Sequence, residues 1–297
     1  MLETIILVVF LTVAAMAWQH LRYLRIRRDS AQDRQLLLHS SDAFHVVVFF
    51  KLGNTDKVVD AVSRFVQQIL ANSKARLVYA GQAAFTMNST QLAHHDWDGV
   101  LLFDYPTRAD YQENLVAGNF HVAREVFSAS YVHGMRRNCH RNLAIPQFLL
   151  RLRFFDIVSG KWCVKPLQSS PVFATFPEYA TWRTREARLR AINTINSQCL
   201  VVYSLVKRGN REQQANNELF GRSMASRMAA LGHGPLHMGR SVALEDFARF
   251  DQVLVIQYPS ANYFADLLSS QFFQGVIGNN LLADSLTVFT IPITDRL

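Results

Sequence analysis

Two aspartates and two histidines are the residues best suited to acid–base chemistry. Asp98 and Asp251 each precede an apolar run of strand length, and burial beside an apolar pocket would make such a carboxylate a general base. The alternative is structural, because an Asp at the start of a strand can bond its own backbone. His45 lies in a β-branched run and His121 follows Phe120. They could serve as a haem ligand and a pocket base, or as core residues, so the catalytic candidates are Asp98, His45 and His121.

Histidine and carboxylate side chains also gather in HHDWD (94–98), and these residue types suit zinc or iron. Adjacent residues of an extended chain point to opposite sides, which favours a solvated loop instead. Cysteines at positions 139, 163 and 199 form no CxxC spacing, and glycine-rich phosphate loops and hydrolase motifs are absent from the sequence. We predict no metal and no organic cofactor, with haem or a metal as the alternative.

Aromatic side chains could line an apolar cleft between helices and a sheet. Ordinary core packing is the alternative for the same side chains. The predicted ligand-binding residues are Tyr79, Trp97, Phe103, Tyr105, Tyr111 and Tyr258.

The elements that would position these residues occur twice in the chain. WDGVLLFDYP (97–106) returns as FDQVLVIQYP (250–259), an offset of 153 positions (250 minus 97). Around each phrase, strand and helix periodicities follow the order β-α-β-β-α-β, which predicts a domain duplication. The copies differ at Trp97 against Phe250 and at Asp104 against Gln257, where a site confined to one half is expected.

Each predicted unit is a ferredoxin-like α+β fold. Its strands are apolar on both sides of the pleat, so packing the two sheets face to face would form an intramolecular pseudo-dimer. DYPTRADYQENLVAGNFHVAREV and QYPSANYFADLLSSQFFQGV resemble the dimeric α+β barrel superfamily, most of all a small bacterial domain family of unknown function, here in two tandem copies. The wider superfamily includes cofactor-independent monooxygenases, lactone isomerases and haem-binding or haem-degrading proteins.

The N-terminal residues predict a single-pass transmembrane helix, with a buried core helix as the alternative. Thr4–Trp18 carries no charge and spans roughly 22 Å, against a hydrocarbon core of about 30 Å. Arginines follow this stretch and none precedes it, which predicts an inner-membrane protein with its N-terminus outside and its body cytoplasmic. The predicted membrane-surface residues are Trp18, Arg22, Arg25, Arg27, Arg28, Arg151 and Arg153.

Five segments follow from these patterns. They are an anchor (1–28), a polar connector (29–42), the first repeat (43–146, with a last extended stretch near 133–146), a basic amphipathic connector (147–196) and the second repeat (197–297). The net charge of +8 lies mainly in the second connector, which fits a lipid surface better than nucleic acid.

Taken together, these features leave enzymatic activity uncertain and favour a non-catalytic module. We expect a membrane-anchored protein that binds a lipophilic small molecule or a membrane-protein partner. Membrane lipid is a further expected partner. The alternative is a monooxygenase- or isomerase-like enzyme acting on an apolar, membrane-derived substrate.

Overall fold

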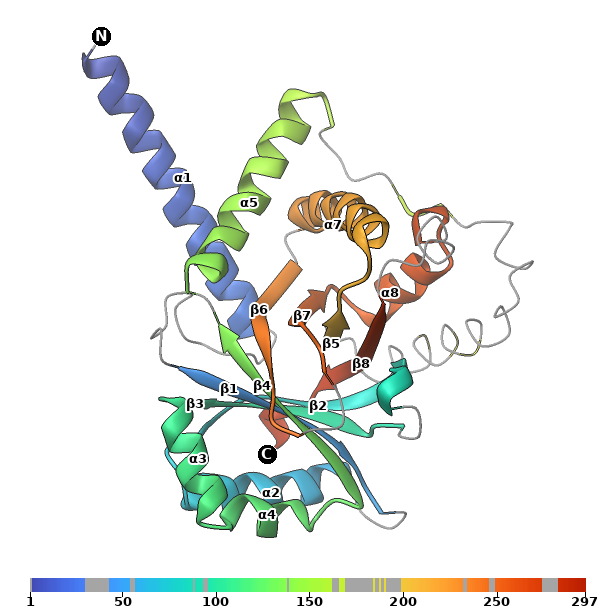
Figure 1. Cartoon of the computed structure of the whole chain (residues 1–297). Helices are drawn as coiled ribbons and strands as arrows, with labels where there is room; N and C mark the ends of the chain where they lie inside the picture. The colour runs from blue at the N-terminus through green and yellow to red at the C-terminus, as the bar shows by residue number, and fades with distance from the viewer. Residues whose placement is uncertain are drawn as a thin grey trace.

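Strands from both halves of the chain pair edge to edge into one closed antiparallel barrel (Figure 1). The computed structural model describes residues 2–29, 43–53, 57–87, 89–92, 96–137, 139–161, 166–168, 184, 187, 190, 199–231, 234–245, 249–273 and 283–297. Around the barrel the strand order is β1-β3-β2-β8-β5-β7-β6-β4. The strands are β1 (Phe44–Lys51), β2 (Arg76–Met87), β3 (Gly99–Tyr105), β4 (Ala129–Arg137), β5 (Leu200–Lys207), β6 (Gly234–Ala243), β7 (Gln252–Tyr258) and β8 (Asp284–Pro292).

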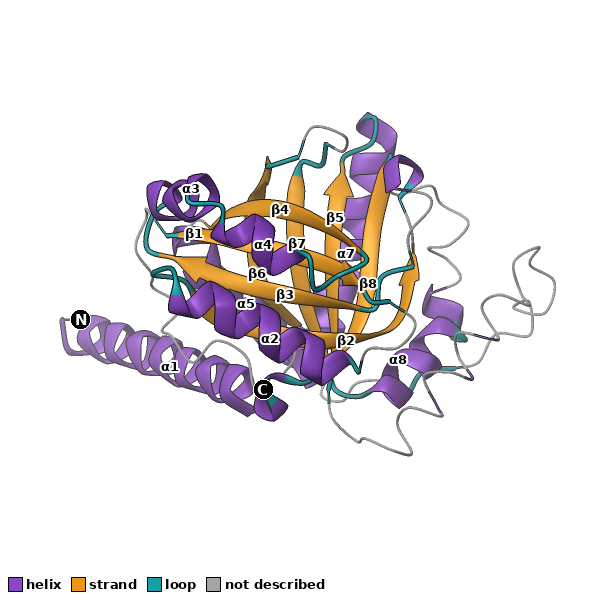
Figure 2. Cartoon of the chain, turned by 90° about the horizontal axis from the view of Figure 1, so that it is seen from below, coloured by secondary structure: helices purple, strands orange, loops and turns teal. Residues whose placement is uncertain are grey.

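Helices cover the outside of the barrel, so its strands are buried on both faces. Figures 1 and 2 show α2, α3 and α4 across the first four strands, and α7 and α8 beside the last four. Short 3₁₀ turns, η1 (Thr90–Leu92) and η3 (Thr294–Arg296), precede β3 and follow β8. The helices are α1 (Leu2–Asp29), α2 (Val58–Ala71), α3 (Arg108–Val116), α4 (Asn119–Arg124), α5 (Cys139–Val158), α7 (Arg211–Leu231) and α8 (Ala261–Leu268).

Successive residues of each strand serve two different cores. In β1, Val46 and Val48 face outward against α2–α4, whereas Val47 and Phe49 face the barrel interior. There they pack in one cluster with residues of the other half, including Val201. This two-sided burial explains why the strands read as nearly continuous apolar runs.

The two halves, β1–β4 and β5–β8, repeat the same local details. The pairing of β2 with β3 shifts register between Leu77 and Tyr79, and the pairing of β6 with β7 shifts between Pro235 and His237. Phe103 lies opposite the first bulge and Ile256 opposite the second, 153 positions apart. A bulge kept at the same place in two pairings indicates that the halves share one strand architecture.

Asp98 and Asp251 hold the chain at equivalent points. The Asp98 carboxylate accepts the backbone N–H of Leu52 at 2.8 Å, and the Asp251 carboxylate accepts that of Arg208 at 2.7 Å. Asp98 and Asp251 therefore both have a structural role, which the presence of an Asp at this point in each half favours. The Asp98 carboxylate thus secures the loop after β1, and its role as a general base stays a prediction.

Helix starts and breaks follow local residue chemistry. Thr107 and Ser260 each cap the next helix, accepting the N–H of Asp110 and Tyr263. Gly118, at φ 77°, separates α3 from α4. A left-handed residue of this kind ends a helix, and glycine adopts it without steric cost.

Polar side chains cross the seams where the halves meet, β2–β8 and β4–β6. At the first seam, the Asp284 carboxylate accepts hydrogen bonds from the Ser89 hydroxyl at 2.5 Å, the Thr90 N–H at 3.1 Å and the Gln91 amide at 3.0 Å. At the second, Glu245 forms an ion pair with Arg124 at 2.7 Å. These contacts join elements about a hundred or more positions apart, so they help to fix the closed barrel.

We expect Asp284→Asn to lower the free energy of unfolding by about 1–3 kcal/mol at pH 7, the range for hydrogen bonds to a charged acceptor. Burial raises the pKa of Asp284, but the bonds from Ser89, Gln91 and Thr90 outweigh it, so the pKa lies below 3.8. A lowered pKa gives stability that is present above about pH 4 and is lost as the pH falls through the folded value. Urea unfolding at several pH values should therefore show the variant and the wild type converging in acid. Asp295→Asn, at an exposed position, is the control and should leave stability unchanged, and a constant difference down to pH 2 would contradict the assignment.

Helix α1 is continuous and extends away from the barrel (Figure 1). Its apolar side chains are exposed, for example Phe10 at 66% and Leu11 at 57%. Among the described residues, however, no helix combines the length and the apolar character needed to cross a bilayer. The predicted transmembrane helix is therefore not supported. The physical reason is that the mostly apolar stretch ends after fifteen residues, where the polar Gln19 and His20 follow.

Helix α5 occupies a region where an extended stretch was expected. Strand β4 ends at Arg137 and α5 runs from Cys139 to Val158, across the boundary predicted at residue 146. It contacts α1, α7 and β6. Of the predicted membrane-surface residues, Trp18 and Arg25 are exposed on α1 and Arg151 is exposed on α5. Most of the connector 147–196 beyond residue 161 lies outside the described residues.

Candidate functional site

The barrel interior contains three buried histidines among its apolar side chains. His45 is 1% exposed, and His133 and His237 are 0% exposed. They come from β1, β4 and β6, and each lies on the inward face of its strand, alternating with residues that face the helices. Buried histidines are uncommon unless they are held by hydrogen bonds, so this interior is the first place to look for chemistry.

His45 is oriented by a carboxylate from the neighbouring strand. Its Nε2 lies 3.3 Å from Asp104 Oδ1, because His45 and Asp104 are directly paired in the β1–β3 register. The other carboxylate oxygen of Asp104 accepts from Arg76 Nη2 at 3.0 Å. Arg76 is partly exposed, with 44% of its side chain accessible. The His45–Asp104 pair therefore lies at one mouth of the barrel, buried on the histidine side and near solvent on the arginine side.

Tyrosine and threonine side chains line the same end of the interior. The Tyr79 hydroxyl lies 2.6 Å from Thr290 Oγ1, and Thr290 donates its only proton to the Val201 carbonyl at 2.8 Å. Tyr79 must therefore donate to Thr290, across the β2–β8 seam. Burial raises the pKa of Tyr79 well above its usual value, so this phenol stays protonated. The ring of Tyr79 stacks on that of Tyr203 with centroids 5.1 Å apart.

Further polar groups from the second half complete this end. The His237 ring lies 6.5 Å from the His45 ring, between centroids. Burial raises the pKa of the Cys199 thiol to about 11, despite a hydrogen bond with Gln257. Such a thiol is protonated at neutral pH and is not a nucleophile. The acid–base capacity at this end therefore rests on the histidines.

The equivalent positions of the second half carry no such pair. Val201 and Gln257 are directly opposite in the β5–β7 register, as His45 and Asp104 are in β1–β3. A valine and an amide thus replace the imidazole and the carboxylate at matching sites of the barrel. The fold itself does not require the pair, since one half forms the same sheet without it.

His133 belongs to a second network, which the sequence analysis missed. Its Nδ1 lies 2.9 Å from the Tyr131 hydroxyl, and its Nε2 is hydrogen-bonded to the Ser241 hydroxyl of β6. Burial lowers the pKa of His133 to about 4, so its imidazole is neutral at physiological pH. The network crosses the β4–β6 seam, and the separation of 108 positions between His133 and Ser241 explains why no local motif indicated it.

Within the described part of the chain, no group of three or more His, Cys, Asp or Glu side chains is arranged to hold a metal ion.

The topology is that of a closed α+β barrel, as the resemblance to the dimeric α+β barrel superfamily implies. No protein-family model and no curated protein matches the sequence. Three solved structures illustrate its distant likenesses, each with a TM-score of 0.42. A provisionally named monooxygenase from Fusobacterium nucleatum is 8% identical and covers 86% of this chain and 94% of its own. A mutant chlorite dismutase from Candidatus Nitrospira defluvii is 13% identical (88% and 95% covered), and an anthrone oxidase-like protein is 7% identical (86% and 92%).

Of the other predicted site residues that the structure describes, Tyr79 lies at the same end of the interior as the His45–Asp104 pair, and the rest are spread over different parts of the fold. His121 is exposed on α4. His94 and His95 lie outside the described residues. The six aromatic candidates are divided among three cores: Tyr79 and Trp97 face the barrel interior, Phe103, Tyr105 and Tyr111 lie under α2–α4, and Tyr258 lies under α8.

Proposed function

We propose that the chain is an enzyme-like tandem α+β barrel in which His45, oriented by Asp104, acts as a general base on an apolar substrate. Its two halves would be copies of one small bacterial domain, with the chemistry kept in the first. The observation that carries this proposal is the buried His45–Asp104 pair at 3.3 Å, replaced by Val201 and Gln257 in the second half.

The proposed proton transfer follows from the geometry of the pair. With Nε2 of His45 3.3 Å from the Asp104 carboxylate, the negative charge of Asp104 favours the tautomer that carries its proton on Nε2, and Nδ1 would be the basic nitrogen. Nδ1 would take a proton from an acidic C–H or O–H of the substrate, giving a substrate anion and an imidazolium that Asp104 stabilises. Returning the proton to another carbon gives an isomer. Alternatively, the carbanion adds O₂ by forming a C–O bond, and the peroxide anion takes back the proton from His45 to give a hydroperoxide. Neither route draws on an organic cofactor.

An apolar substrate is supported by the surroundings of the pair. The interior next to His45 is lined by aliphatic and aromatic side chains, among them Val47, Leu102 and Val255. The Tyr79 and Tyr203 rings and the Gln257 amide, at the same end of the interior, would orient the substrate through their polar groups. Few polar groups in an apolar surround are typical of sites for lipophilic small molecules.

The proposal is tested by asking whether the full-length protein consumes an apolar compound. Purified protein is incubated in air with the apolar extract of its host cells, and mass spectrometry follows which compounds disappear and which form. We expect one compound to be converted to an isomer or to a product containing added oxygen. The absence of any conversion beyond that seen with heat-denatured protein would overturn the proposal.

A second candidate function is binding without catalysis, of a lipophilic small molecule or a membrane-protein partner. The exposed apolar side chains of α1, such as Phe10 and Leu21, favour it, since exposed apolar surface of this extent commonly meets a partner. In the same assay this function gives a compound or subunit that co-purifies with the protein and is not consumed.

A further inference from the structure

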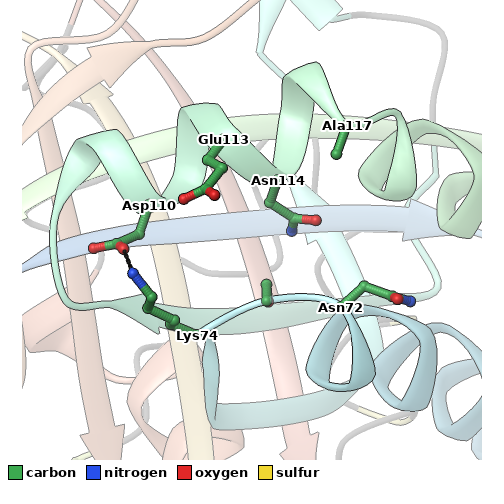
Figure 3. A pocket seen from close by; sticks show the side chains of 7 residues that line it. Asn72, Lys74, Asp110, Glu113, Asn114 and Ala117 are labelled. Carbon is green, nitrogen blue, oxygen red and sulfur yellow. Dashed lines mark hydrogen bonds and ion pairs between the residues drawn. The ribbon is translucent and has the colours of Figure 1, made fainter.

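A polar pocket lies on the outer face of the first half, away from the barrel interior. It opens between the turn that follows α2 (residues 72–74) and helix α3, and it encloses about 210 Å³ (Figure 3). At about 30 Å³ per water molecule, this is room for roughly seven waters or one small organic molecule. None of the residues of the His45–Asp104 pair lines it.

Hydrogen bonds beneath the pocket fix the orientation of the Asn114 amide. Ser73 donates its only hydroxyl proton to the Ile69 carbonyl at 2.7 Å and accepts the N–H of Ala75. This hydroxyl therefore has no proton left to donate to the Asn114 amide. The Tyr105 hydroxyl oxygen accepts a hydrogen bond from Asn114 Nδ2 at 3.0 Å. The amide is held with its nitrogen toward Tyr105 and its oxygen away from it.

The Asn114 oxygen is a buried acceptor that lines the pocket. Asn114 is 3% exposed, and its Oδ1 accepts no hydrogen bond from the residues that the structure describes. Figure 3 shows the amide between α3 and Asn72, inside the pocket. A buried carbonyl oxygen without a donor costs free energy, which a ligand with an N–H group would remove.

The second half shows that this amide is not needed to build the fold. Helices α3 and α8 are capped at Thr107 and Ser260, 153 positions apart. At the same offset Leu267, 0% exposed, stands where α3 has Asn114. Packing of this helix on the sheet is therefore satisfied by leucine. The polar residue of the first half calls for another explanation.

Charges around the pocket indicate which ligand would supply the donor. Lys74 Nζ forms an ion pair with Asp110 at 2.8 Å, which neutralises both groups. The hydrogen bond and charge of Asp110 raise the pKa of Lys74, and Glu113 adds to the effect, which places this second carboxylate nearby. One lysine and two acids leave the pocket with a formal charge of −1.

We propose that this pocket binds a small primary ammonium compound, whose –NH₃⁺ group donates to Asn114 Oδ1 and to the Glu113 carboxylate. An ammonium group carries three donors and no acceptor, which matches an amide oxygen beside an acidic side chain. The site is separate from the His45–Asp104 pair and does not depend on the function of that pair.

Ligand-observed NMR on the full-length protein tests this with butylammonium and butyrate, two probes of equal size and opposite charge. Butylammonium should bind and butyrate should not.

Asn114→Leu, which copies the residue of the second half, should weaken butylammonium binding at least tenfold. Asn217→Leu, on α7, is the matched control and should leave it unchanged. Glu113→Gln, at an exposed position, should weaken binding by about threefold or more and supplies a second variant if Asn114→Leu does not fold. Equal binding of butyrate, or butylammonium binding within twofold of wild type in both pocket variants, would overturn the proposal.

Discussion

Asp104→Asn is expected to lower the turnover of the apolar substrate by about 10²- to 10⁴-fold, the range for loss of a positioned acid–base group. The amide that replaces the carboxylate can turn its NH₂ group toward His45 Nε2. Nε2 then accepts a hydrogen bond, so the imidazole carries its proton on Nδ1. The basic nitrogen would no longer face the substrate, and the imidazolium would lose its counter-charge. Rates of the conversion found with wild-type protein provide the measurement, and His45→Gln should give a loss of the same size.

The control for this prediction is Asp60→Asn, the same change at an exposed position in the first turn of α2. It removes one carboxylate from the same half without touching the barrel interior, so the rate should stay within about twofold of wild type. Turnover by Asp104→Asn within threefold of wild type would contradict the assigned role of the pair.

Phe65→Ala is expected to lower the free energy of unfolding by about 3–5 kcal/mol, the usual range for removing a buried phenylalanine. Phe65 is 0% exposed on α2, and its ring contacts those of Phe103, Phe120 and Phe127, with centroids 5.9, 6.0 and 4.9 Å away. The substitution leaves a cavity where α2, α4 and β3 meet. Urea unfolding followed by circular dichroism measures the loss.

Leu70→Ala is the control for this second prediction, because Leu70 lies on the same helix and is 40% exposed. It should cost less than about 0.5–1 kcal/mol. A loss below 1 kcal/mol for Phe65→Ala would show that the outer core of the first half can close around the missing ring.

The strands and their repetition could be predicted from sequence because they depend on local patterns. The phrase around Tyr105 and its counterpart around Tyr258 mark a strand that ends where a capped helix begins, and both junctions are confirmed. The difference between Asp104 and Gln257 also marked a position where a site confined to one half would be sought. These features can be read from the sequence because residue type and spacing along one strand determine them.

The contacts that form the site could not be predicted, because they depend on pairing between distant strands. Whether His45 meets Asp104 is decided by the β1–β3 register, and whether His133 meets Ser241 by closure between β4 and β6. The bulge between Leu77 and Tyr79 turns Tyr79 inward, and periodicity alone does not reveal a bulge. Helix α5 was missed because the basic stretch HGMRRNCHRN (133–142) reads as one edge strand, whereas β4 ends at Arg137 and α5 begins at Cys139.

Closure of the barrel within a single chain has a consequence for how its interior can change. In a barrel assembled from two identical chains, any substitution in the interior appears twice, and the interior exists only above the dissociation constant. Here both seams join parts of one polypeptide, so the partner sheet is present at a fixed one-to-one ratio at any dilution. A polar pair such as His45–Asp104 can then be introduced once, with its desolvation cost borne once, while the opposite sheet keeps Val201 and Gln257.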